Sequence, residues 1–181
     1  MLPALAIVAA VVAAPLLYAT TRPDTFRVQR TARIRARPET IFPHLADFRR
    51  WEAWSPWEKM DPGMTRTHSG AETGAGAVYA WEGNRKVGKG RMEITEAAAP
   101  ERLVIQLDFI APFAASNVTE FTLAPEEGGT AVTWTMQGRS AYMMKLMGVF
   151  MSMDRMVGKD FEAGLASLKE VAERDAGALP A

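Results

Sequence analysis

The sequence contains no cysteine and only two histidines in 181 residues. The absence of cysteine excludes disulfide bonds, thiolate nucleophiles and cysteine-based zinc sites, and two histidines are too few for a histidine-rich metal site. We therefore expect neither a metal ion nor a cofactor.

The chain also lacks a net charge, because lysine and arginine together number 21 and aspartate and glutamate also number 21. Nucleic-acid-binding proteins usually carry a basic excess, so the composition predicts no nucleic acid as a partner. Internal repeats and low-complexity segments are absent as well. A chain of this length with 48% hydrophobic residues fits one globular domain with an appendage.

The appendage is expected at the N-terminus, where residues 1–19 include no charged side chain. A helix of this length reaches nearly 30 Å at about 1.5 Å per residue, which just spans a bilayer. We assign residues 1–21 to a transmembrane anchor. A cleaved signal peptide is the main alternative, although no lysine or arginine precedes the apolar run, and a peripheral apolar helix is a third.

Six arginines follow this segment, opposed only by Asp24. They are Arg22, Arg27, Arg30, Arg33, Arg35 and Arg37. The positive-inside rule would then place a membrane-anchored domain on the cytoplasmic side, whereas cleavage would give a periplasmic or secreted protein. The same arginines also fit the solvated face of a strand over residues 26–36, with Val28, Ala32, Ile34 and Ala36 on its other side.

The remaining pattern predicts short helices after Pro38, then antiparallel strands from Met64 to Gln137, and one long C-terminal helix over residues 140–171. Each later strand has one apolar face, and only the long helix could cover such a sheet. We expect an α+β fold in which a curved antiparallel sheet of about seven strands grips that helix. The domain should span residues 26–175, followed by a disordered tail over 176–181.

Three tryptophans, Trp51, Trp54 and Trp57, lie within twelve residues of one another. Rings gathered so closely either close one end of a core or form the rim of a pocket, and we expect a mixture of both.

The predicted C-terminal helix has one apolar stripe about seven turns long. It comprises Met143, Met147, Phe150, Val157, Phe161, Leu165 and Leu168. Asp154 lies on this stripe and has three interpretations: the N-cap of a second helix, a ligand-facing carboxylate, or one partner of an ion pair. The neighbouring charges Lys159, Asp160 and Glu162 are interpreted as solvated.

Several motifs resemble those of one family. They are Ile34-x-Ala36-x-Pro38-Glu39-x-Ile41-Phe42, Asp47-x-x-x-Trp51-x-x-Trp54-Ser55-Pro56-Trp57, Gly129-Thr130-x-Val132-x-Trp134 and Gly158-Lys159-Asp160-Phe161-Glu162-x-Gly164-Leu165. Together with the order of elements they resemble the START-like helix-grip superfamily, in particular its polyketide cyclase/dehydrase and lipid-transport (SRPBCC) group.

This resemblance implies a cavity for an apolar or amphipathic ligand between sheet and helix. The residues that it implies as ligand-binding are Trp57, Tyr79, Trp81, Met92, Phe109, Asn117, Phe121, Trp134, Met143, Met147, Phe150 and Asp154. Core packing is the alternative role for most of them. Asn117 and Asp154 are polar, and an inward polar group needs a partner, a water molecule or a ligand.

Three functions remain open at this point. The first is a membrane-tethered carrier or sensor of a hydrophobic small molecule or lipid, without catalysis. The second is a cyclase or dehydratase-like enzyme, with Asp154 as acid or base and Asn117 polarising a carbonyl. The third is an interaction module that binds a partner protein through the tryptophan cluster and the methionine face. The oligomeric state cannot be predicted from these patterns.

Overall fold

The computed structural model describes residues 13–140, 145–146 and 153–178. Its strands are β1 (Thr25–Ile34), β2 (Thr65–Gly70), β3 (Ala77–Glu82), β4 (Lys89–Ala98), β5 (Arg102–Ala111), β6 (Ala115–Glu126) and β7 (Gly129–Arg139). Its helices are α2 (Pro38–Ala46), α4 (Met153–Ala178) and the two 3₁₀ helices η1 (Phe48–Ala53) and η2 (Pro56–Lys59), together with a short helix at 13–20.

The seven strands form one antiparallel sheet in the order β1-β7-β6-β5-β4-β3-β2. Alternate side chains of β5, β6 and β7 are buried, so one face of the sheet is apolar. The turn between β6 and β7 contains Gly128, whose φ of 77° lies in the left-handed region that glycine adopts most easily. The predicted α+β class and the seven-stranded curved sheet are confirmed.

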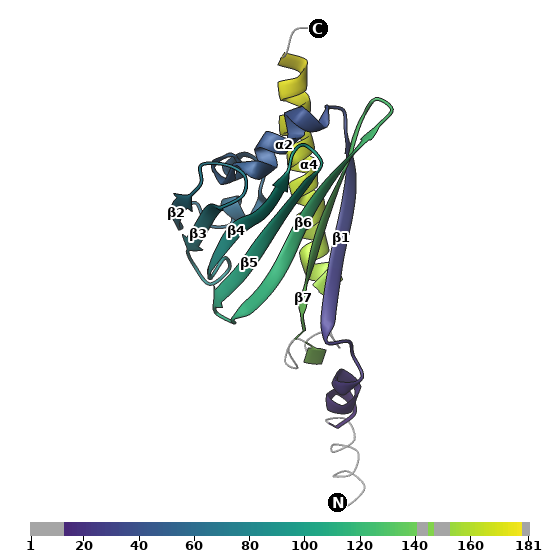
Figure 1. The fold of residues 1–181 in the computed structure, drawn as a ribbon. Helices are drawn as coiled ribbons and strands as arrows, with labels where there is room; N and C mark the ends of the chain where they lie inside the picture. The colour runs from purple at the N-terminus through teal and green to yellow at the C-terminus, as the bar shows by residue number, and fades with distance from the viewer. Residues whose placement is uncertain (1–12, 141–144, 147–152, 179–181) are drawn as a thin grey trace, which may run out of the picture.

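Helix α4 covers this apolar face and packs against β1, α2 and both 3₁₀ helices (Figure 1). Its buried side chains Phe161, Leu165 and Leu168 join the core formed by the sheet. Gly164 permits a close approach, because a Cβ atom at this position would lie 2.8 Å from Cζ3 of Trp134. The helix is therefore pressed against the sheet at its middle.

Helix α4 extends beyond the C-terminal end of the helix predicted over residues 140–171, and residues 145–146 are helical as well. The described helix begins at Met153 and continues through Ala178, so residues 176–178 are helical and do not belong to a disordered tail. Residues 141–144, 147–152 and 179–181 lie outside the described range. The predictions for Met143, Met147 and Phe150 therefore concern residues that the structure does not describe.

The predicted membrane anchor needs a correction. Residues 1–12 lie outside the described range, and the described helical residues at this end are 13–20. In the part of the chain that the structure describes, no helix combines the length and the apolar character needed to cross a membrane. The prediction of a membrane-anchored protein with its domain on the cytoplasmic side is contradicted by this finding.

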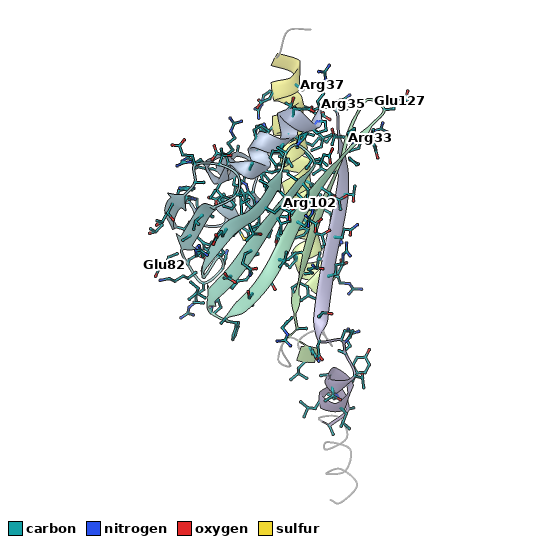
Figure 2. All side chains as sticks on the ribbon, in the orientation of Figure 1. Arg33, Arg35, Arg37, Glu82, Arg102 and Glu127 are labelled. Carbon is teal, nitrogen blue, oxygen red and sulfur yellow. The ribbon has the colours of Figure 1, made fainter. Side chains whose placement is uncertain are left out.

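Three of the six arginines, Arg27, Arg30 and Arg33, lie in β1, as the second interpretation expected, and Arg35 follows its end. Arg33 and Arg35 point outward near Glu127 at the upper end of the sheet (Figure 2), where Arg33 donates to the Glu127 carbonyl oxygen and Arg35 pairs with Glu173. Arg30 is an exception, because it shares the inward parity of Val28 and reaches α4. The sequence pattern placed Arg30 on the wrong face.

Candidate ligand-binding site

A cavity of about 180 Å³ lies between the sheet, the first turns of α4 and the two 3₁₀ helices. Six of the residues that the family resemblance implies as ligand-binding contribute to its wall: Trp57, Tyr79, Trp81, Met92, Phe109 and Trp134. Twelve further residues complete the lining: Trp51, Ser55, Glu58, Met64, Lys86, Val87, Leu107, Thr119, Met136, Val157, Asp160 and Phe161. Aromatic and aliphatic side chains therefore make up most of the wall.

The aromatic rings of this wall support one another in two groups. On β3 and β5, Tyr79 stacks on Trp81 at 6.1 Å between ring centroids, and Trp81 meets the edge of Phe109 at 5.8 Å. At the other side, Trp134 of β7 stacks on Phe161 of α4 at 4.0 Å with an interplanar angle of 9°. Such contacts hold the rings in fixed orientations and keep the cavity open.

The tryptophan cluster is divided between core and cavity, as predicted. Trp54 is fully buried and donates its indole N–H to the carbonyl of His44 at 3.0 Å. Trp51 donates in the same way to the carbonyl of Leu45 and also reaches the cavity. Pro56 starts η2 and directs Trp57 toward α4, where its ring meets the edge of Phe161. Satisfied indole groups allow the rings to be buried at little cost.

A buried polar network forms one side of the cavity. The hydroxyl of Tyr79 donates to Oε1 of Glu58 at 2.6 Å, and Nε of Arg66 donates to Oε2 of the same carboxylate at 2.7 Å. Burial, and then the adjacent Glu58 carboxylate, raise the pKa of Tyr79 well above its ordinary range. The hydrogen bond from Arg66 offsets the free-energy cost of removing the Glu58 carboxylate from water.

Asp160 is the second carboxylate of the cavity, and sequence reasoning missed it. It was interpreted as a solvated helix charge, whereas the structure places it among the lining residues, between Val157 and Phe161. Burial raises the pKa of Asp160. Its position three residues after Val157 was a usable signal, since residues at that spacing lie on neighbouring parts of one helix face. Glu58 and Lys86 were missed as well.

Three predicted site residues do not line this cavity. Phe121 is fully buried in the core, where it contacts the rings of Trp51, Trp54 and Trp134. Asn117 is buried opposite Gly138, and its Oδ1 has no hydrogen-bond donor among the described residues.

Asp154 is exposed in the first turn of α4 and forms an ion pair with Arg30, with both carboxylate oxygens accepting from the guanidinium at 2.8 and 3.1 Å. This hydrogen bond and the positive charge of Arg30 lower the pKa of Asp154. Of the three interpretations of Asp154, the ion pair agrees with this geometry.

No group of three or more histidine, aspartate or glutamate side chains could hold a metal ion within the described ranges. The side chains that line the cavity can bury an apolar molecule and can form hydrogen bonds or ion pairs at a few polar groups. Such a combination is typical of small-molecule sites.

Solved structures with the same fold have low sequence identity to this chain. Protein CV1439 from Chromobacterium violaceum matches with a TM-score of 0.59 and 18% identity, covering 84% of this chain and 99% of that one. The Aha1 dimer from Colwellia psychrerythraea has a TM-score of 0.56 and 18% identity, with coverages of 82% and 96%. The di-domain ARO/CYC BexL from the BE-7585A biosynthetic pathway has a TM-score of 0.58 and 16% identity, with coverages of 91% and 54%. At such identities these likenesses establish the fold alone.

No curated protein sequence matches this chain. The sequence model of one family does match, and it spans the whole sheet and nearly all of α4. The resemblance seen in the sequence motifs is thereby confirmed. The chain belongs to the polyketide cyclase/dehydrase and lipid transport family, whose model matches residues 25–173.

Proposed function

We propose that this protein is a carrier or sensor that binds a small hydrophobic molecule in the cavity between the sheet and α4. The observation that carries the proposal is the cavity itself, whose wall is mainly aromatic and aliphatic. An apolar wall of this kind gains free energy when it releases water to bind an apolar ligand. Membership of a family named for cyclases and lipid transport supports the same function.

The size of the cavity restricts the ligand. A volume of about 180 Å³ is slightly larger than the roughly 150 Å³ that accommodates benzene. It is smaller than the roughly 300–1,000 Å³ typical of sites for drug-sized molecules. We therefore expect a compound with one or two rings, or a short chain, and not a lipid with two acyl chains.

The alternative function, a cyclase or dehydratase-like enzyme using Asp154 and Asn117, has less support. Asp154 lies outside the cavity lining and both its oxygens contact Arg30. Asn117 does not contribute to the lining either. These two side chains are therefore poor candidates for acting together on a molecule in the cavity.

A binding experiment with a blocked cavity tests the proposal. The Leu107→Trp substitution adds bulk to the cavity wall on β5, whereas Val104→Trp adds the same bulk to the opposite face of that strand. We expect 2-phenylethanol to bind the wild type and Val104→Trp in calorimetric titrations, with at least about tenfold weaker binding to Leu107→Trp, equivalent to about 1.4 kcal/mol. Circular dichroism verifies that both variants are folded. Equal binding to all three proteins, or binding to none, would contradict the proposal.

A further inference from the structure

The polar groups of the cavity differ in whether they are already bonded. Glu58 uses both carboxylate oxygens within the protein, one for the hydroxyl of Tyr79 and the other for Arg66. Within the ranges that the structure describes, Asp160 forms no hydrogen bond or ion pair with a side chain. Asp160 is therefore the carboxylate of the cavity that is available to a ligand.

No ion pair compensates the charge of Asp160 within the part of the chain that the structure describes. Burial raises the pKa of this carboxylate. Lys86 also lines the cavity, but it is an exposed side chain in the loop between β3 and β4. The position of the lysine thus leaves Asp160 without an ion-pair partner.

A partly buried carboxylate without a partner is unfavourable, and a ligand that supplies a positive charge or a strong donor removes this cost. The aromatic wall favours the same kind of ligand, because the faces of tryptophan and tyrosine rings attract cations. Trp57, Trp81 and Tyr79 line the cavity together with Asp160. Both features therefore select for an organic cation over a neutral molecule or an anion.

We propose that the ligand is a small apolar compound with a protonated amine, and that Asp160 binds the ammonium group while the aromatic wall encloses the apolar part. This inference rests on the proposed function of the cavity and specifies its ligand class. Glu58 keeps its bonds to Tyr79 and Arg66 in the complex.

Three probes of similar size and different charge test the ligand class. These are 2-phenylethylamine, which is cationic at neutral pH, the neutral 2-phenylethanol, and the anionic phenylacetate. We expect the amine to bind roughly tenfold or more tightly than the alcohol, because a hydrogen bond between two charged groups contributes more than one made by a neutral hydroxyl. Phenylacetate should bind most weakly, since its carboxylate would meet Asp160.

Two matched variants assign the preference to Asp160. Asp160→Asn removes the charge but keeps the shape of the side chain, and it should abolish the preference for the amine over the alcohol. Glu170→Gln removes one negative charge from an exposed position of the same helix and should leave the preference unchanged. The measured quantity is the ratio of the affinities for the amine and the alcohol. A partial loss of folded protein would lower the apparent binding of both probes equally and would leave this ratio unchanged.

The outcomes separate this inference from the function on which it rests. Equal binding of amine and alcohol to the wild type, or an unchanged preference in Asp160→Asn, would overturn the role of Asp160 while the cavity remained a binding site. Failure of every probe to bind the wild type would overturn both. A preference for the amine that disappears only in Asp160→Asn is the result we expect.

Discussion

Tyr79 connects the wall of the cavity to the polar network behind it. Its ring packs against Trp81 and Phe48, and its hydroxyl is bonded to Glu58. The hydroxyl therefore donates to a carboxylate that is itself buried. When a buried carboxylate loses one of its two hydrogen-bond donors, part of the free-energy cost of removing it from water is no longer compensated. The hydrogen bond from Tyr79 to Glu58 should therefore contribute more to stability than a hydrogen bond at the surface.

We expect Tyr79→Phe to lower the free energy of unfolding by roughly 1–2 kcal/mol, because it removes one donor to a charged acceptor and leaves the ring in place. Urea denaturation measures the change, and Tyr18→Phe at an exposed site is the matched control. A loss of similar size in both variants would indicate that the network contributes nothing specific.

The same residue gives a pH dependence. Because the pKa of Tyr79 is raised on folding, its contribution to stability is fully present below the ordinary tyrosine value of about 10 and is lost as the pH rises above it. The stability of the wild type should therefore fall more steeply above pH 10 than that of Tyr79→Phe.

At the scale of the elements, Arg30 joins β1 to the first turns of α4. It forms ion pairs with Asp154 and Glu162 and lies over Gly158, where a Cβ atom would come within 2.0 Å of its Nη2. Glycine at this position leaves space for the guanidinium. The ion pair that holds Asp154 is therefore part of the attachment of α4 to the sheet.

His44 makes a second connection, between α2 and the C-terminal part of α4. Its ring is buried, and Nε2 lies 3.1 Å from Oδ2 of Asp175. Burial lowers the pKa of His44, and this effect exceeds the opposing attraction of Asp175. The folded structure therefore favours the neutral form of His44.

This depressed pKa makes stability fall with acidification. His44 takes up a proton at a higher pH in the unfolded chain than in the folded one. Its contribution to stability is therefore fully present above about pH 6.5, the ordinary histidine pKa, and is lost as the pH falls toward the pKa of His44 in the folded state. We expect His44→Gln to show a shallower decrease in unfolding free energy between about pH 7.5 and 5.5, as measured by urea denaturation. His68→Gln replaces the other, exposed histidine and should retain the slope of the wild type; an identical slope in all three proteins would contradict the argument.

For the molecule as a whole, the family resemblance combined with strand alternation predicted much of the cavity wall. Tyr79, Trp81, Met92, Phe109 and Trp134 follow the period of two, and each of them lines the cavity. Strand parity does not show how far the covering helices extend along a strand. Phe121 was predicted to line the cavity, but tryptophan rings cover it and it belongs to the core. The sheet was therefore easier to predict than the boundary between core and cavity.

The polar part of the site depended on contacts distant in sequence. Glu58 meets Tyr79 across 21 positions of the chain, and Asp154 meets Arg30 across 124 positions. Asp160 lies about 60° from Val157 around the helix axis at 100° per residue, beside the predicted stripe. The helical period alone places Asp160 at the edge of the apolar stripe. Whether a side chain at such an edge is buried depends on the neighbouring elements.

The central claim is that an apolar compound enters the space between the sheet and α4. Trp51, Trp57, Trp81 and Trp134 line that space, whereas Trp54 is buried outside the lining. The indole N–H resonances in a ¹H–¹⁵N NMR titration with 2-phenylethanol therefore test the claim most directly. We predict larger shifts for these four tryptophans than for Trp54, and an absence of shifts at all four would contradict the account.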